Sequence, residues 1–251
     1  MRLTDSHTHL FMEPLSGSMD AVLHRASSAG VTRLVVPAYD HDSWRPVSAL
    51  AGRPGVSVAL GLHPWAAAEG LGPAILARAL QDCRAVAVGE IGLDSKVDVP
   101  PEVQEGVLTG QLEVARELGL PVILHCRGAF DRLLSIMEGF GGSLRGVLHA
   151  FSRGPQLAAE LVDLGLYLGV GGAATRPRAR RIRRSLPGIP RERLLLETDS
   201  PSMGLEGVPA GESEPAHVRD VCMAAAGMLG MEPEELAETT WRNADELFGL
   251  A

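Results

Sequence analysis

Short apolar runs recur along this chain, separated by longer segments whose apolar positions lie three or four residues apart. Runs that are apolar at nearly every position are typical of parallel strands buried on both faces, and the wider spacing is typical of amphipathic helices. Eight strands alternating with helices predict an α/β fold, a TIM (β/α)8 barrel. The predicted strands are Arg2–Asp5, Val31–Pro37, Val56–Leu60, Ala85–Gly89, Pro121–Leu124, Gly146–Leu148, Leu166–Val170 and Arg193–Thr198.

The predicted helices have recognisable ends. One begins at Pro101 and stops before Gly119, which matches the preference for proline at the start of a helix and glycine just past its end. Two helices follow the last predicted strand, Pro215–Leu229 and Pro233–Leu247, so the barrel carries an extra C-terminal helix. Since a barrel of this kind takes roughly 250 residues, we expect a single domain over residues 1–251.

Histidines and acids follow these apolar runs at their carboxyl ends. Enzymes with this fold build their active sites at that end of the barrel, from residues far apart in sequence. Imidazole and carboxylate groups are also common metal ligands. The sequence therefore predicts a metal centre in the mouth of the barrel, with the candidate ligands His7, His9, Glu90, His125, His149 and Asp199.

Some of these residues have features of their own. His7 and His9 are two positions apart, so in a strand they point to the same side and can bind one ion. Glu90 lies between glycines, which indicates close approach of the backbone to a neighbour. Its carboxylate can bridge two cations, and Asp199 can both bind a metal and take a proton from water. Asp5 is either an acceptor that fixes a histidine tautomer or an ordinary turn residue.

Three further residues are candidates for substrate binding. Arg127 follows a strand and has the planar fork that suits phosphate, although a surface ion pair explains it equally well. Arg176 opens a run of arginines after the seventh strand, a pattern that is usually a solvated helix face. His63 ends the third strand, where loop packing is the alternative. Glu197 is expected to form hydrogen bonds inside the barrel, and Asp94 could simply cap its loop.

Composition narrows the class of protein. The net charge is −8 and the pI is about 5.5, which argues against coating nucleic acid but leaves room for a local phosphate site at the mouth. No apolar run approaches the roughly 20 residues of a membrane span. The three cysteines are widely spaced and odd in number, so we expect a cytoplasmic protein without disulfides. Nothing implies an obligate protein partner.

Taken together, these motifs resemble the TatD family of metal-dependent hydrolases and deoxyribonucleases, among the amidohydrolase-like barrels. The resemblance extends over essentially the whole chain. The segment Val170–Ala179 and the loop Met203–Pro215 look closer to the YjjV-like branch of the family. The matching motifs are Asp5–Leu10, Gly61–Pro64, Val88–Asp94, Leu120–Arg127, His149–Ser152, Gly169–Gly172, Leu196–Pro201 and Arg242–Phe248.

The resemblance implies a binuclear centre. One divalent ion would be held by His7, His9, Glu90 and Asp199, and the other by Glu90, His125 and His149. The expected metal is one of Zn, Mn, Ni, Co or Mg. One segment departs from the family: where TatD-type members usually carry a basic stretch, this chain reads Ala-Gly-Glu-Ser-Glu-Pro (Ala210–Pro215), which weakens the case for efficient DNA hydrolysis.

The expected reaction is hydrolysis by a metal-activated water, with Asp199 and Glu90 as catalytic residues and His63, Arg127 and Arg176 contacting the substrate. The substrate would be DNA or a small phosphoester or ester. A small-molecule amidohydrolase or aminoacyl-ester hydrolase is the rival, although the subset with a modified lysine bridge is disfavoured because the only lysine is Lys96. A non-catalytic metal-binding scaffold is the alternative from another class.

Overall fold

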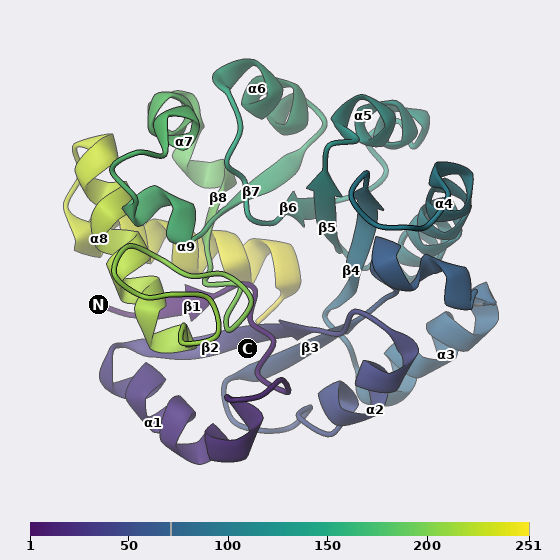
Figure 1. Ribbon diagram of the computed structural model, residues 1–251, viewed down its shortest axis with the longest axis horizontal. Helices are drawn as coiled ribbons and strands as arrows, with labels where there is room; N and C mark the ends of the chain where they lie inside the picture. Colours follow the sequence, from purple (N-terminus) through teal and green to yellow (C-terminus); the bar gives the residue numbers. More distant parts are fainter. Residues whose placement is uncertain (71, 251) are drawn as a thin grey trace.

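A computed structural model describes residues 1–70 and 72–250 of the chain. Its eight parallel strands pair in sequence order, with helices outside them, so the predicted barrel is confirmed (Figure 1). Residue 251, the last of the predicted domain, lies outside the described residues. The strands are β1 (Leu3–Asp5), β2 (Val31–Pro37), β3 (Val56–Leu60), β4 (Ala87–Asp94), β5 (Val122–Arg127), β6 (Gly146–Leu148), β7 (Leu166–Val170) and β8 (Leu194–Leu196).

Helices connect the strands and cover the outside of the barrel. The helix expected from Pro101 ends at Leu118, as the sequence predicts. The α-helices are α1 (Met19–Ser28), α2 (His41–Ser48), α3 (Pro73–Cys83), α4 (Pro101–Leu118), α5 (Phe130–Gly139), α6 (Pro155–Asp163), α7 (Arg180–Ser185), α8 (Val218–Leu229) and α9 (Pro233–Phe248). Short 3-10 turns are η1 (Ser16–Ser18), η2 (Pro64–Glu69), η3 (Gly172–Thr175), η4 (Leu186–Gly188), η5 (Arg191–Arg193) and η6 (Pro215–His217).

Several boundaries differ from the predicted ones. β4 continues to Asp94 and β5 to Arg127, because polar residues near the mouth stay in the ladder, where Asp94 pairs with Arg127. β8 ends at Leu196 instead of Thr198, since the following residues turn towards the first strand. The helix expected over 215–229 is divided into η6 and α8.

The barrel closes between its first and last strands. Beyond β1 and β8, the Ser6 amide donates to the Leu196 carbonyl at 2.9 Å, the Asp199 amide to the His7 carbonyl at 2.8 Å and the His9 amide to the Ser200 carbonyl at 2.7 Å. We call residues 5–9 and 196–200 the closing seam. Its buried hydroxyls also pair, with Thr8 Oγ1 2.8 Å from Ser200 Oγ.

The last helix closes the floor of the barrel. Seven strands each contribute one inward side chain to a separate core cluster, and α9 adds Ala244, Leu247 and Phe248 to it. In Figure 1 the yellow ribbon of α9 lies across the barrel. The inward side chains are Val35, Ala59, Ala87, Ile123, Val147, Tyr167 and Leu195.

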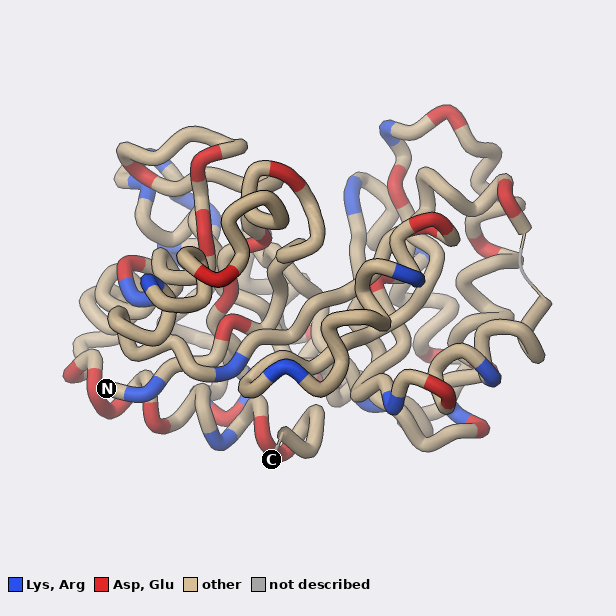
Figure 2. The backbone as a smooth tube through the Cα atoms, turned by 90° about the horizontal axis from the view of Figure 1, so that it is seen from below, with Lys and Arg blue, Asp and Glu red and all other residues tan. Residues whose placement is uncertain are grey.

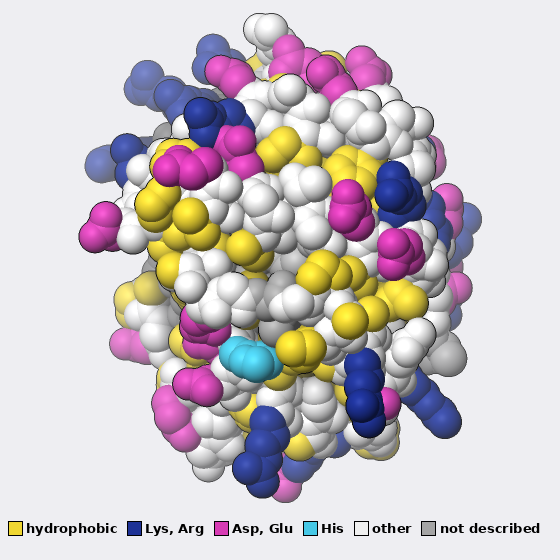
Figure 3. Space-filling model, turned by 90° about the vertical axis from the view of Figure 1, so that its right-hand side faces the viewer, with side chains coloured by type: hydrophobic (Ala, Val, Ile, Leu, Met, Phe, Trp, Pro, Cys, Tyr) yellow, Lys and Arg dark blue, Asp and Glu magenta, His cyan; other side chains and the backbone are white. Residues whose placement is uncertain are grey.

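The two ends of the barrel differ. In Figure 2 the chain rises on both sides at the top, and the amino terminus lies towards the opposite, lower side. Apolar side chains are scattered among charged ones on the face that carries α3 and α4 (Figure 3). No helix within residues 1–70 and 72–250 has the length and hydropathy needed to cross a membrane.

The floor of the barrel should be a major source of stability. Leu247 is 1% exposed, and replacing it with alanine leaves a cavity that α9 cannot fill without moving. We expect Leu247→Ala to lower the free energy of unfolding by about 2–5 kcal/mol in urea titrations. Arg242→Ala, on the exposed side of the same helix, should change it by less than about 0.5 kcal/mol. Equal effects of the two substitutions would contradict the proposed packing.

Candidate metal centre

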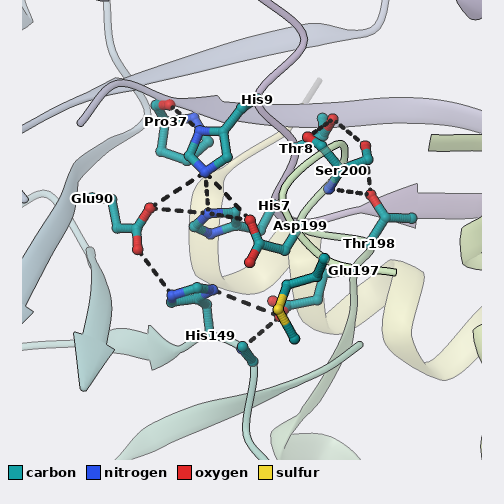
Figure 4. A network of polar contacts seen from close by, with 12 residues as sticks. His7, Thr8, His9, Pro37, Glu90, His149, Glu197, Thr198, Asp199 and Ser200 are labelled. Carbon is teal, nitrogen blue, oxygen red and sulfur yellow. Dashed lines mark hydrogen bonds and ion pairs between the residues drawn. The ribbon is translucent and has the colours of Figure 1, made fainter. Parts of the chain in front are cut away.

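The Glu90 carboxylate lies at the centre of a buried group of histidines. Its Oε2 atom is 3.2 Å from His7 Nε2 and 3.5 Å from His9 Nε2. Its Oε1 atom is 2.9 Å from His149 Nε2, 3.2 Å from His125 Nδ1 and 3.5 Å from His63 Nε2. The two oxygens of one carboxylate therefore face two different sets of imidazoles, part of which is drawn in Figure 4.

An irregularity in β4 aims Glu90 into the barrel mouth. Val88 pairs with Val122 and Ile91 with Leu124, so β4 has one residue more than β5 between these pairs. Such a bulge redirects a side chain. The Glu90 amide donates to the carbonyl of Ala38, the residue after β2, at 2.8 Å. A Cβ atom at Gly89 would lie 2.6 Å from the Ile123 Cβ, which explains why a glycine precedes Glu90.

The closing seam supplies the first set of side chains. His7 Nε2 lies 3.3 Å from His9 Nε2, and His9 Nε2 lies 3.4 Å from Asp199 Oδ1. His9 Nδ1 is 3.2 Å from the Pro37 carbonyl, an arrangement that puts a proton on Nδ1 and leaves Nε2 free to bind a cation. Asp199 has a φ of +52°, and its amide is held by the His7 carbonyl, so the seam sets the direction of its carboxylate.

The second set comes from β5 and from the residues that follow β3 and β6. His125 Nδ1 is 3.1 Å from His149 Nε2, and His125 Nε2 is 3.2 Å from Asp94 Oδ2. Asp94 therefore orients the His125 ring, in addition to accepting the Lys96 amide as a turn residue would. His63 is only 2% exposed, and its Nδ1 atom accepts the Trp65 amide, which turns Nε2 towards Glu90.

The shifted pKa values of Glu90 and His149 indicate that this cluster of histidines and carboxylates favours positive charge. Burial alone would raise the pKa of Glu90, but His149, His7 and His63 hold it well below its usual value. Burial opposes protonation of His149, yet Glu90, Glu197 and Asp199 raise its pKa to about 10. The same carboxylates that favour a proton on this ring also favour a metal cation.

Not every histidine follows this trend. Burial lowers the pKa of His7 to about 4 and that of His63 to about 3, so both rings are neutral at physiological pH. Burial acts in the same direction on His9 and His125, but hydrogen bonds to Asp199 and to Asp94, respectively, leave the pKa of each ring raised. Neutral imidazole is the form that binds metals.

The donor set fits metal ions. Three groups of residues have ligand atoms close enough to share an ion: His7, His9 and Glu90; His63, Glu90 and His125; and His7, His149 and Glu197. The Nε2 atoms of His7 and His9 lie 3.3 Å apart, and both face Glu90 Oε2, so these three atoms are close enough to bind one cation together. The first two groups share Glu90, as the sequence predicts for a bridging carboxylate.

A pocket of about 440 Å³ opens onto these residues. Among its lining residues are His125, His149 and Asp199, together with Arg127, Arg153 and Met203. Arg127, one of the predicted substrate-binding residues, therefore faces the same pocket as the candidate ligands. Arg153 was not singled out from the sequence, because it follows a Phe-Ser pair and not an apolar run.

The other predicted positions take different places. Among the described residues, those that line this pocket do not include Arg176. Its Nη2 atom donates to the Gly204 carbonyl at 2.9 Å and so connects η3 to the loop after β8. Asp5 accepts the backbone amide of Thr198 at 3.0 Å and the Thr198 hydroxyl at 2.6 Å. These bonds belong to the closing seam and not to a histidine ring.

Glu197 points into the barrel and is fully buried, as expected. Its Oε1 atom accepts the Ala150 amide at 2.5 Å and lies 3.9 Å from His149 Nδ1, whereas its Oε2 atom has no partner among the described residues. Burial raises the pKa of Glu197 to about 7. Its proximity to His149 could not be read from the sequence, since the two residues come from different strand ends.

Comparison with known proteins shows which family the chain belongs to. The family model described as TatD related DNase matches residues 4–249. The chain is 36% identical over 255 residues to the uncharacterized metal-dependent hydrolase YjjV of Escherichia coli, covering 99% of this chain and 98% of the relative. It is 35% identical to the 3'-5' ssDNA/RNA exonuclease TatD of Erwinia billingiae, over 92% of this chain and 93% of that protein.

A solved structure agrees with these matches. The crystal structure of the TatD homologue YjjV from Escherichia coli superposes with a TM-score of 0.91 at 35% identity, over 100% of this chain and 99% of that one. The chain therefore belongs to the TatD family of metal-dependent hydrolases and DNases.

Proposed function

We propose that this protein hydrolyses phosphodiester bonds in single-stranded nucleic acid, at a site that holds two divalent cations. The observation that carries the proposal is the Glu90 carboxylate, each of whose oxygens faces a separate set of imidazole nitrogens. In addition, the adjoining pocket is lined by two arginines, Arg127 and Arg153, that have no carboxylate within 4.0 Å among residues 1–70 and 72–250. The name of the Erwinia relative, an exonuclease on single-stranded DNA and RNA, supports the substrate class.

The residues divide between two cation positions. His7, His9, Asp199 and Glu90 Oε2 would hold one ion. His125, His149 and Glu90 Oε1 would hold the other, and His63 Nε2 is near enough to Glu90 to bind there as well or to contact the substrate. When bound, two such cations lower the pKa of water and stabilise charge on the attacking and leaving oxygens. Imidazole-rich positions favour Zn, Mn, Ni or Co over Ca, and Mg is a further candidate.

Asp199 is the proposed general base. Its pKa is lowered, because the hydrogen bond from His9 and the neighbouring histidines outweigh burial. The carboxylate is therefore ionised at neutral pH and can accept the proton of the attacking water. It also lines the pocket, so a substrate and a water can reach it.

Arg127 and Arg153 are the proposed phosphate contacts. Arg127 is exposed at the end of β5, and the Arg153 guanidinium lies 4.8 Å from the centre of the Phe130 ring, which holds it beside the pocket. A planar guanidinium can donate two hydrogen bonds to one phosphate. Arg176 can contact a phosphate of the substrate only after its hydrogen bond to the Gly204 carbonyl is broken. We place the protein, one domain with three free cysteines, in the cytoplasm.

Metal content tests the binuclear proposal directly. We expect two ions per chain by elemental analysis after reconstitution with excess metal and removal of unbound ions. His125→Ala should retain about one, because it removes a ligand from one position only. His41→Ala changes an exposed histidine outside the site and should keep two. One ion or fewer in the saturated wild type would contradict the binuclear proposal.

The role of Asp199 is tested by Asp199→Asn, which keeps the shape of the side chain but cannot accept a proton. We expect turnover of bis-p-nitrophenyl phosphate to fall by about 10²–10⁴-fold, the usual contribution of a general base. Glu206→Gln, an exposed substitution in the following loop, should leave turnover within about twofold. Near-normal turnover in the fully metallated Asn variant would remove Asp199 from the reaction.

The wild type also distinguishes the alternative functions. Activity of the metallated wild type on neutral esters or amides alone would favour an amidohydrolase. No activity on any of these substrates would favour a non-catalytic metal-binding scaffold.

Metal binding should strengthen as pH rises. The raised pKa of His149, about 10, means that this ring holds a proton at neutral pH in the metal-free protein, and a cation must displace it. Each proton released makes the affinity rise by roughly tenfold per pH unit. Zn²⁺ titrations in a chelating buffer between about pH 6 and about pH 8 measure this slope. His24→Ala, at an exposed position on α1, should not alter it, and a flat profile would show that the ligands bind no protons.

A further inference from the structure

We propose that five arginines form a track that carries the phosphates of a single-stranded nucleic acid away from the metal pocket. The residues of this arginine track are Arg127, Arg153, Arg178, Arg180 and Arg181. The inference rests on the proposed function, since it extends the substrate beyond the bond that is cut.

The track is continuous along the surface. Arg127, Ser152 and Arg153 line the pocket beside the candidate ligands. A second pocket, of about 310 Å³, is lined by Ser152 together with Arg178, Arg180 and Arg181. Ser152 therefore lines both pockets, which lie side by side.

The two parts are also held together by a partly buried hydrogen bond. The Ser185 hydroxyl, on α7, donates to the Arg153 carbonyl at 2.5 Å. This bond fixes α7 against the loop that carries Arg153. The arginines around α7 are consequently placed by the fold relative to the metal pocket, although their side chains are exposed.

The charge of the track is not neutralised by the protein. Arg2, Arg25 and Arg53 each form an ion pair with a carboxylate elsewhere on the surface. None of the five track arginines has such a partner within 4.0 Å among the described residues. The stretch from residue 164 to residue 191 contains no acidic residue at all, in a chain whose net charge is −8. In Figure 2 blue segments gather at the distant upper left, where α7 lies.

A phosphate backbone fits this arrangement. Guanidinium groups donate to phosphate in a planar, two-pronged geometry, and a polyanion bound to them releases its counterions. Phe130 lines the same pocket, and its ring supports the Arg153 guanidinium, which lies 4.8 Å from the ring centre. A flexible single strand can follow the surface from the pocket past Ser152 to α7. The missing basic stretch at 210–215 would then be replaced by arginines at the end of β5 and after β6 and β7.

Binding to a labelled oligonucleotide tests the track without cleavage. We would measure the fluorescence anisotropy of a twelve-nucleotide oligo(dT) with metal-free protein, for the wild type and the triple variant Arg178→Ala/Arg180→Ala/Arg181→Ala. The Kd of the triple variant should rise about tenfold or more, and the slope of log K against log salt should fall by about two, near 0.7 for each lost phosphate contact. Binding of a dinucleotide, too short to reach α7, should change by less than about twofold.

The matched control removes the same charge elsewhere. Arg78→Ala/Arg116→Ala/Arg219→Ala changes three exposed arginines on α3, α4 and α8. This variant should keep the oligonucleotide affinity within about twofold. An equal loss in both triple variants would overturn the proposal, because net charge alone would then explain binding. Unchanged affinity in the first variant, or wild-type binding to vesicles of anionic phospholipid in place of the oligonucleotide, would also overturn it.

The outcome separates the track from the proposed function. A wild type that binds the oligonucleotide through the track but cleaves no phosphodiester with any metal would support the track and refute the proposed function. A wild type that cleaves, with equal efficiency in both triple variants on the twelve-nucleotide substrate, would support the proposed function and refute the track.

Discussion

The closing seam is the constraint on which the site depends. Thr8 and Ser200 are 192 positions apart in sequence, yet their hydroxyls are 2.8 Å apart, and backbone bonds on either side join His7 to Asp199 and His9 to Ser200. These are buried polar groups, which are costly to bury unless they are paired. Because the residues that close the barrel alternate with the candidate ligands, the bonds that complete the fold also aim the side chains of one cation position. Stability and chemistry are therefore encoded in the same few residues.

The Glu90 carboxylate stays ionised although it is buried in the interior. Burial disfavours its ionised form, and the imidazoles around it reverse that effect. In a regular strand, side chains alternate between the two faces of the sheet. The extra residue between Val88 and Ile91 interrupts this alternation in β4, and the Glu90 side chain faces both sets of histidines. The glycine before it lets β4 approach Ile123 closely. Backbone irregularity, close strand packing and charge are thus parts of one arrangement.

Much of this could be predicted from the sequence. Apolar runs located all eight strands, and the rule that parallel strands end at one face brought His7, Glu90 and Asp199 together. What could not be predicted depends on register and on side-chain direction. The bulge in β4 has no local signal beyond its glycines, so the apolar pattern alone predicts a strand that ends before Glu90. The contacts of Asp94 with His125, of Glu197 with His149 and of Arg176 with Gly204 join segments whose relative height in the barrel only the three-dimensional structure gives.

The α9 floor has a consequence for biosynthesis. A ribosome releases the first strands long before the last helix, and domains complete their folding only when all their parts are available. Until α9 emerges, the inward side chains of seven strands have no cover at that end, and the first strand has no partner for its free edge until the segment after β8 arrives. We therefore expect the barrel to remain open at its seam and at its floor through most of translation. Asp199 meets His7 and His9 only across the seam, so these three ligands cannot act together until the segment after β8 has been synthesised.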